Sequence, residues 1–529
     1  MRTKNSLINI AVSFLSYGII LIGSFVTRQL FVSILGLEMV GIEGTFLNVV
    51  SALAIVELGL GVGIVYKLYK PISEKNWDQV AVILCFLRKC CIITAAAVAG
   101  LGVISAYFVV MPIKGDFSKL WLAQIFILYV FDVVASYLHS HKRTMLIADQ
   151  KNYVNNTIHT FVQVFLFVSQ IAVLKIWASF EAYLICKIIF KLAENMIISY
   201  RFNKRYSFIN LKTKNHMPEI EKKDLFKNIK ALLFHKIAGL GATTASGLIA
   251  VYFVSLRETG IYSNYMLIVT ALTTVSNEVF NGILASFGNL LNTESRTKVY
   301  NNFNVLYFLN FLLYSFIVSA FICIITPFAD LWTGQGSAFG IWTTVAIGGY
   351  LYVWGMKQSV GMAKVGAGIY DPDKYMAVLG AVITVILSIV LVRYLGIAGV
   401  MIGNIIGIIS ISYWVQSYII YNEIFKKPVK TYHLKYALYT LLTAVYAYIT
   451  YTICAWALSH GGAVDFISSG LVGTLHISKN YAYLIAQIIF NSFVCLIIPN
   501  ILNVIIFYRT LEFQNLLKAT KSFLKRSKG

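Results

Sequence analysis

Long apolar runs recur along the whole chain, and short polar segments, most of them basic, separate the runs. Many runs reach 18 or more residues, a length that crosses a bilayer core of about 30 Å as a helix. The pattern predicts an all-α polytopic membrane protein with about 14 transmembrane helices. The expected spans are residues 6–35, 44–66, 80–110, 120–141, 153–174, 178–200, 231–255, 260–284, 305–328, 340–362, 375–392, 396–418, 436–458 and 481–508.

A basic segment divides the apolar blocks, because residues 201–230 carry nine Lys and Arg side chains. Basic loops between spans face the cytoplasm. We therefore expect an N-terminal lobe, a cytoplasmic connector, a C-terminal lobe, two accessory spans and a basic cytoplasmic tail. Their expected bounds are 1–200, 201–230, 231–420, 421–508 and 509–529.

The distribution of basic residues also predicts orientation. With fourteen spans, about 31 Lys and Arg residues lie inside and about 6 outside. Both termini are then cytoplasmic. The basic N-terminus, with no small-residue cleavage site, is typical of a retained first span.

The two halves resemble each other. The sequence around Gly41 aligns with that around Gly260, and residues 149–153 (DQKNY) align with residues 371–375 (DPDKY). Six spans in each half give both halves one orientation, which is the parallel repeat of some secondary transporters. The sequence therefore predicts two six-helix lobes in parallel pseudo-repeat plus two C-terminal helices.

Composition excludes a soluble protein, since 58% of residues are hydrophobic and only 12% are charged. The formal net charge of +22 lies in short loops and forms no nucleic-acid recognition surface. The expected electrostatic partner is the anionic membrane lipid of the inner leaflet. The seven cysteines show no metal-ligand spacing.

Charged and strongly polar residues inside spans mark pathways, because lipid exposure of such groups is costly. Here they recur three or four residues apart, on shared helix faces, and their net charge is positive. A positive cavity attracts an anion, and guanidinium groups suit phosphate oxygens. The candidate substrate-binding residues are Arg28, Lys187, Lys191, Lys236, His235, His159, Gln163 and Asn277. The candidates for ion coupling are Asp132, Glu57 and Glu278.

Structural roles compete with these functional ones. Arg143 is also consistent with a loop residue facing headgroups, and Arg28 with an outer-interface position. Lys187, Lys191 and Glu194 also fit a local ion-pair ladder. Glu57 lies in ELGLGVG, where glycines favour close helix approach. Asn and Thr stripes also serve helix packing.

Nucleotide and hydrolase motifs are missing from the sequence. It contains no Walker phosphate loop, zinc motif or nucleophile elbow. The longest expected outer segment, residues 459–480, is short for a catalytic domain. We therefore expect no enzyme and no cofactor.

Several segments resemble the bacterial polysaccharide repeat-unit flippases, the oligosaccharide-flippase branch of the multidrug/oligosaccharidyl-lipid/polysaccharide exporter superfamily. The most specific segments are ELGLG, KRTMLIADQ, YSNY and GNL, and the similarity extends over the first twelve spans. The resemblance implies alternating access and transfer of an undecaprenyl-pyrophosphate-linked oligosaccharide from the inner to the outer leaflet of the bacterial cytoplasmic membrane. One departure is Ser246, where some relatives carry an acidic residue, which puts the coupling residue in doubt.

The expected function is thus a flippase for surface polysaccharide such as capsule or exopolysaccharide, with an H⁺ or Na⁺ gradient and a polysaccharide polymerase machinery as further expected partners. A multidrug/cation antiporter of the same superfamily is the first alternative, although it should prefer an acidic cavity. A membrane polysaccharide polymerase or ligase is the second, and a longer outer segment would favour it.

Overall fold

The computed structural model describes residues 2–54, 57–213, 215–369, 372–475 and 478–526. This part of the chain consists of α-helices and two short π-helices, with no β-strand. Among its helices, nine are long and apolar enough to cross a membrane. The chain is an all-α polytopic membrane protein, which confirms the class that the hydropathy pattern predicts.

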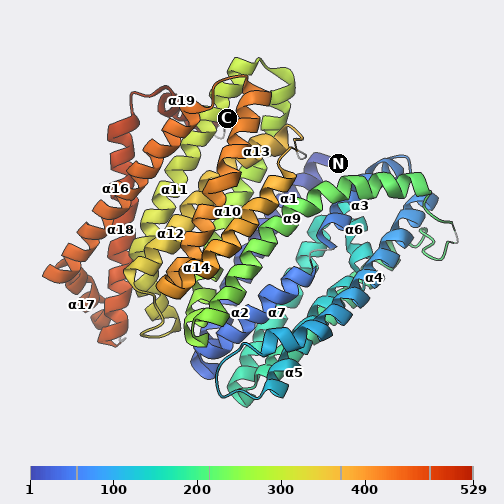
Figure 1. The fold of residues 1–529 in the computed structure, drawn as a ribbon, viewed down its shortest axis with the longest axis horizontal. Coiled ribbons are helices and arrows are strands. Elements are labelled where there is room, and N and C mark those ends of the chain that lie inside the picture. Colours follow the sequence, from blue (N-terminus) through green and yellow to red (C-terminus); the bar gives the residue numbers. More distant parts are fainter. Residues whose placement is uncertain (1, 55–56, 214, 370–371, 476–477, 527–529) are drawn as a thin grey trace. The chain divides into compact units, whose positions relative to one another are not determined.

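The chain forms two compact units, residues Met1–Ser263 and Asn264–Gly529. The first unit holds α1 to α9 and the first turns of α10, coloured blue to green in Figure 1. Their bounds are α1 Arg2–Leu35, α2 Leu37–Leu53, α3 Glu57–Ser73, α4 Trp77–Val110, α5 Lys119–Tyr137, α6 Ser140–Ala148, α7 Asn152–Trp177, α8 Phe180–Arg205, α9 Glu219–Phe253 and α10 Leu256–Thr293.

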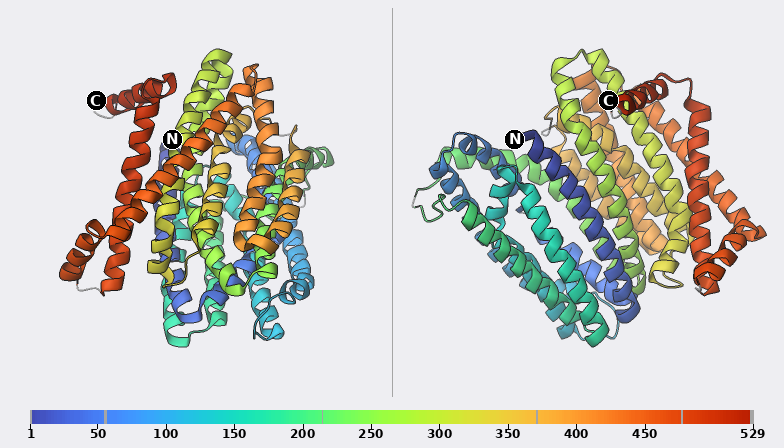
Figure 2. Two further views of the ribbon diagram at one scale, coloured as in Figure 1. Left: turned by 60° about the vertical axis from the view of Figure 1, so that its left-hand side comes forward. Right: turned by 180° about the vertical axis from the view of Figure 1, so that it is seen from behind.

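An aromatic core holds four helices of the first unit together. Phe46 on α2 packs edge-on against Phe126 on α5, with ring centroids 5.2 Å apart. Phe31 on α1 packs in the same way against Phe180 on α8, at 5.3 Å. All four rings are buried, and such pairs add to the stabilisation from burial itself. This core fixes α1, α2, α5 and α8 beside one another, and α1 also runs along α7 (Figure 2).

Residues of α8 supply much of the polar chemistry in this unit, so its starting point matters. Ser179 precedes the helix, and its hydroxyl accepts a hydrogen bond from the backbone N–H of Ala182 at 3.2 Å. This N-cap satisfies one of the free N–H groups of the first turn. With the start fixed, Lys187, Lys191 and Glu194 follow at helical spacing along one side of α8.

The second unit holds the rest of α10 and all later helices, coloured yellow-green to red in Figure 1. Their bounds are α11 Arg296–Thr333, α12 Ile341–Met356, α13 Gln358–Gly366, α14 Lys374–Gly407, η2 Ile408–Tyr413, α15 Trp414–Ile419, η3 Ile420–Phe425, α16 Lys430–His460, α17 Ala463–Leu475, α18 Lys479–Phe507 and α19 Leu511–Arg526. The two η elements are π-helices.

A tight helical hairpin lies within α14. Gly396 adopts φ 56° and ψ −136°, which breaks the helix between the two spans predicted at 375–392 and 396–418. Beyond this turn, Gly403 faces Ser388 and Gly407 faces Thr384, so closely that a Cβ would lie 2.5 Å or less from the opposite hydroxyl. Small residues thus allow the two limbs to pack backbone to backbone.

Every predicted span has a helical counterpart, but several boundaries are wrong. The outer turn expected at residues 36–43 is reduced to Gly36, whose φ of 88° ends α1, and α2 starts at once. The connector expected at 201–230 contains the end of α8, which reaches Arg205, and the start of α9, which begins at Glu219. The span predicted at 44–66 comprises α2 and α3, and residues 55–56 between them lie outside the described residues.

Four further helices lie outside the predicted spans or extend them, namely α6, α13, α17 and α19. Two of them reflect the internal repeat. Both α6 and α13 have nine residues and lie between an apolar helix and the segment that the repeat aligns, DQKNY or DPDKY. Both halves of the chain thus use the same succession of apolar helix, short helix and long helix.

Candidate functional site

The first polar contact of the N-terminal unit joins α1 to α2. A nitrogen of the Arg28 guanidinium, Nη1, lies 2.6 Å from Oε2 of Glu43, and the two side chains are only 14% and 9% exposed. The sequence predicted Arg28 as a site residue but placed Glu43 in a loop. A signal was present, since Glu43 stands in an otherwise apolar run, where a carboxylate needs a partner.

The second contact joins α8 to α5. Nζ of Lys187 lies 3.0 Å from Oδ2 of Asp132, and it also lies 5.3 Å from the ring centroid of Tyr129. Asp132 is buried, and its second carboxylate oxygen, Oδ1, has no hydrogen-bond partner among the described residues. In this ion pair, Lys187, a predicted substrate-binding residue, contacts Asp132, a predicted ion-coupling residue.

The third contact centres on Glu194, which is completely buried on α8. Its Oε1 lies 2.8 Å from Nη2 of Arg143 on α6 and 3.1 Å from Nδ1 of His159 on α7. Arg143 also donates to Oδ1 of Asn195 at 3.0 Å. Arg143 is therefore not a free loop residue, and Glu194 bonds to other helices instead of forming a ladder along α8.

Together these residues form what we call the N-unit charge cluster: Arg28, Glu43, Asp132, Arg143, His159, Lys187, Lys191 and Glu194. With His159 neutral, it contains four cations and three carboxylates, which leaves one positive charge. Among the described side chains, no carboxylate forms an ion pair with Lys191. Lys191 is half-buried on α8, between Lys187 and Glu194. An anion is therefore the ligand that this cluster favours.

The structure describes the side chains of three of the remaining predicted residues. Gln163 is half-buried on α7. Asn277 and Glu278 lie on the part of α10 in the second unit, half-buried and exposed respectively. His235 and Lys236 lie on α9 and Glu57 starts α3, but the side chains of these three lie outside the described residues.

In the described part of the chain, no group of three His, Cys, Asp or Glu residues could hold a metal ion. The chemistry of the N-unit charge cluster is thus that of charge pairing and hydrogen bonding. Its three carboxylates already form ion pairs with three of the four cations. A ligand anion must therefore either bind to Lys191 or displace a carboxylate from its cation.

Comparison with known proteins finds similarity in structure alone. No family model matches the sequence, and no curated protein matches it. The lipid II flippase MurJ in an inward closed conformation superposes with a TM-score of 0.64 at 12% identity, over 94% of this chain and 99% of that one.

Two multidrug resistance transporters are also similar. An inward-facing MATE family transporter of the MOP superfamily has a TM-score of 0.58 at 15% identity, over 77% of this chain and 96% of that one. A mutant of the Vibrio cholerae MATE transporter VcmN has a TM-score of 0.53 at 12% identity, over 80% of this chain and 98% of that one. This chain therefore has the all-α membrane-transporter fold that MurJ shares with the MATE transporters of the MOP superfamily.

Proposed function

We propose that this protein is a flippase that moves an undecaprenyl-pyrophosphate-linked oligosaccharide from the inner to the outer leaflet of the bacterial cytoplasmic membrane. The observation that carries the proposal is the N-unit charge cluster, in which partly buried cations outnumber carboxylates. A pyrophosphate group is the part of such a substrate that needs buried positive charge, since leaving an anion unpaired in a low-dielectric site is costly.

Arg28 and Lys191 are the two residues that we assign to the pyrophosphate. Lys191 needs no rearrangement, because no described carboxylate pairs with it. Arg28 must exchange Glu43 for a phosphate oxygen, and its planar guanidinium suits either group. Arg28 keeps an anionic partner throughout this exchange, so the exchange costs little free energy. An Arg28 that lost Glu43 without gaining a phosphate would be left as an unpaired charge, which is strongly destabilising.

The other predicted residues take supporting roles in this proposal. Lys187 is held by Asp132, so it contributes to the positive potential while Asp132 remains a candidate for coupling to H⁺ or Na⁺. His159 and Gln163 on α7, with Asn277 on α10, offer hydrogen bonds to sugar hydroxyls. His235, Lys236, Glu57 and Glu278 remain candidates on sequence grounds.

The transport cycle follows from the proposed lobes, residues 1–200 and 231–420, which rock about the substrate with both termini in the cytoplasm. Only a ligand that binds the two conformations with different affinity shifts their balance. Polysaccharide assembly for the cell surface is the process that consumes such a substrate, through a polymerase machinery outside this chain. The structural similarity to the lipid II flippase MurJ supports a lipid-linked glycan as the substrate class.

The test is headgroup translocation in proteoliposomes, with a labelled undecaprenyl-pyrophosphate oligosaccharide and a membrane-impermeant probe. We expect protein-dependent flipping that falls about tenfold or more in Arg28→Ala and in Lys191→Ala, because hydrogen bonds to charged groups contribute about 1.5–3 kcal/mol. The matched control is Arg296→Ala, which removes an exposed arginine at the start of α11.

Glu43→Gln adds a test of the exchange between Glu43 and phosphate. The change removes the competitor of the pyrophosphate and should tighten substrate binding. Flipping that is unchanged in both alanine variants would refute the assigned anion site. A folded protein that flips none of several glycan headgroups would refute the function, and export of a cationic dye would then favour the antiporter.

A further inference from the structure

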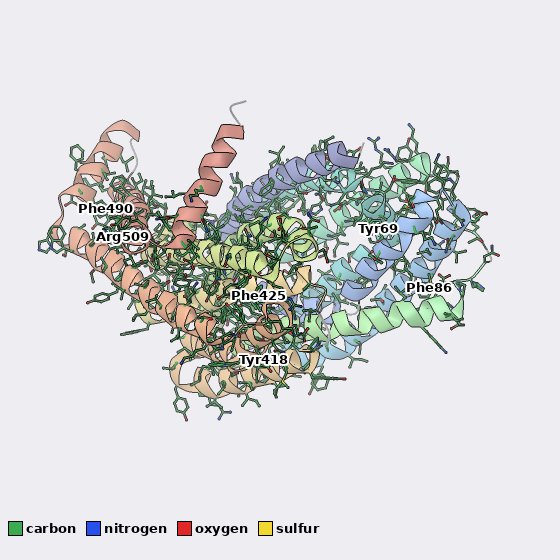
Figure 3. All side chains as sticks on the ribbon, turned by 90° about the horizontal axis from the view of Figure 1, so that it is seen from above. Tyr69, Phe86, Tyr418, Phe425, Phe490 and Arg509 are labelled. Carbon is green, nitrogen blue, oxygen red and sulfur yellow. The ribbon has the colours of Figure 1, made fainter. Side chains whose placement is uncertain are left out.

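A second cationic site lies in the N-terminal unit, apart from the N-unit charge cluster. A cavity of about 830 Å³ opens between α4 and the connector that joins α8 to α9. Phe86 lies on its α4 wall, beside the start of α9 (Figure 3). The lining includes Arg88, Lys89, Ile92 and Ile93 of α4, together with Lys212 and Lys222.

The connector forms a fixed wall of this cavity, because it packs onto α4. Phe208 packs against Trp77 at the start of α4, with ring centroids 4.6 Å apart. Sγ of Cys85 donates to the backbone carbonyl oxygen of Leu211 at 3.2 Å. Met217 is buried, being only 3% exposed. Two contacts with α4 and the burial of Met217 thus hold the connector against the helix.

The cavity carries more positive than negative charge. Arg88 and Lys89 project from α4, and Lys212 and Lys222 come from the connector and α9. Glu219 is the single carboxylate in the lining and already accepts from Nζ of Lys222 at 2.6 Å. Arg88, Lys89 and Lys212 form no ion pair within the described part of the chain.

A neighbouring group responds to the same charge. His141 on α6 is largely buried, and burial together with the charges of Lys142 and Arg88 lowers its pKa to about 3. Burial and the charge of Arg88 lower the pKa of Lys142 as well. The charge of Arg88 thus contributes to the lowered pKa of both neighbouring groups.

The length of α4 indicates the level of the cavity relative to the bilayer core. This helix has 34 residues, of which about 20 suffice to cross the bilayer core. Residues 91–110 form an uncharged stretch of that length at its C-terminal end. Arg88 and Lys89 then lie at the boundary between hydrocarbon and headgroups, while Ile92 and Ile93, 53% and 69% exposed, face the acyl chains.

We propose that this cavity binds the phosphate headgroup of an anionic phospholipid, with Arg88, Lys89, Lys212 and Lys222 around the phosphate and an acyl chain along Ile92 and Ile93. Charge complementarity and the position at the core boundary favour a membrane lipid over a soluble anion. Such a lipid would fasten the connector to α4 at the membrane surface. The proposal is independent of the flippase substrate.

The test is binding of short-chain phosphatidylglycerol to the purified full-length protein in detergent. Phosphatidylcholine of the same chain length and free glycerol phosphate are the comparison ligands. We expect clear preference for phosphatidylglycerol. The double variant Arg88→Gln/Lys89→Gln should bind it about thirtyfold more weakly. Each cation near the lipid contributes about 1 kcal/mol, and about 1.4 kcal/mol corresponds to a tenfold change in affinity.

Two further variants control for folding and for general charge. Lys223→Gln removes an exposed cation of α9 that does not line the cavity, and it should leave binding unchanged. Asn215→Lys adds a cation to the lining and should strengthen binding about fivefold. Equal affinity for phosphatidylcholine, equally tight binding of glycerol phosphate, or no response to either change in the lining would overturn the proposal.

Discussion

Gly41 on α2 and Gly260 on α10 pack against each other in a reciprocal way. A Cβ added to Gly41 would lie 2.3 Å from the carbonyl oxygen of Leu256, and one added to Gly260 would lie 2.0 Å from that of Leu37. The internal repeat aligns Leu37 with Leu256 and Gly41 with Gly260. The repeated segments therefore meet as equivalent partners, with local two-fold symmetry at the contact.

Gly41→Ala tests this contact. The new methyl group would meet backbone, which cannot move aside as a side chain can, so we expect a loss of about 1–3 kcal/mol or more in stability. The measurement is thermal unfolding of the purified protein in detergent. Gly282→Ala on α10 is the control, because nothing lies within 4 Å of its added Cβ. Equal stability of the two variants would contradict the close packing.

Glu194→Gln tests the buried centre of the N-unit charge cluster. The change removes the charge that holds Arg143, so Arg143 loses its ionic partner, and it leaves an amide beside Nδ1 of His159. We expect a loss of about 2–3 kcal/mol, below the range of about 3–5 for fully buried pairs, because Arg143 is 27% exposed. Glu423→Gln, an exposed site, should be neutral in the same unfolding assay. A neutral Glu194→Gln would show that the pairing contributes nothing.

Lys187 and Asp132 call for a double-mutant cycle. Lys187→Met and Asp132→Asn each leave one partner of a 3.0 Å ion pair without its counter-charge. We expect the losses in unfolding free energy of the two single variants to add up to more than the loss of the double variant. The difference, which is the coupling energy, should be about 1–3 kcal/mol. Additive effects in the unfolding assay would mean that the two charges act independently.

Glu512 links the C-terminal helix α19 to α16, since its Oε1 lies 2.7 Å from Nζ of Lys435. α19 lies at the end of the chain, beyond α18 (Figure 2). Burial acts to raise the pKa of Glu512, but the hydrogen bond from Lys435, a backbone hydrogen bond and the charge of Lys435 together outweigh it, and the pKa is lowered from its usual 4.5. A lowered pKa means that the contact stabilises above the unfolded-state pKa and is lost as pH falls through the folded-state value.

We therefore expect α19 to detach in acid, below about pH 4.5. A spin label or fluorophore at Lys518, which is exposed, would report its mobility. Glu512→Gln should reproduce the release at neutral pH and remove the pH dependence. Release in acid that persists in Glu512→Gln would assign the effect to another group.

Sequence alone predicted the features that depend on local composition. The length and hydrophobicity of the runs predict the spans, since a helix in lipid satisfies its backbone hydrogen bonds within itself. The repeat was visible around Gly41 and Gly260, and the break at Gly396 fell where one span was expected to begin. Arg28, Lys187 and Asp132 stood out because charges in apolar runs are rare.

Tertiary structure decided which of these charges belong together. Glu43 became the partner of Arg28, Asp132 that of Lys187, and Arg143 with His159 that of Glu194. Each pair joins residues on different helices, and helix packing sets their distances, whereas the spacing along one helix only shows which residues share a face. The same reason hid the cavity between α4 and the connector, whose walls meet only when the connector packs on α4.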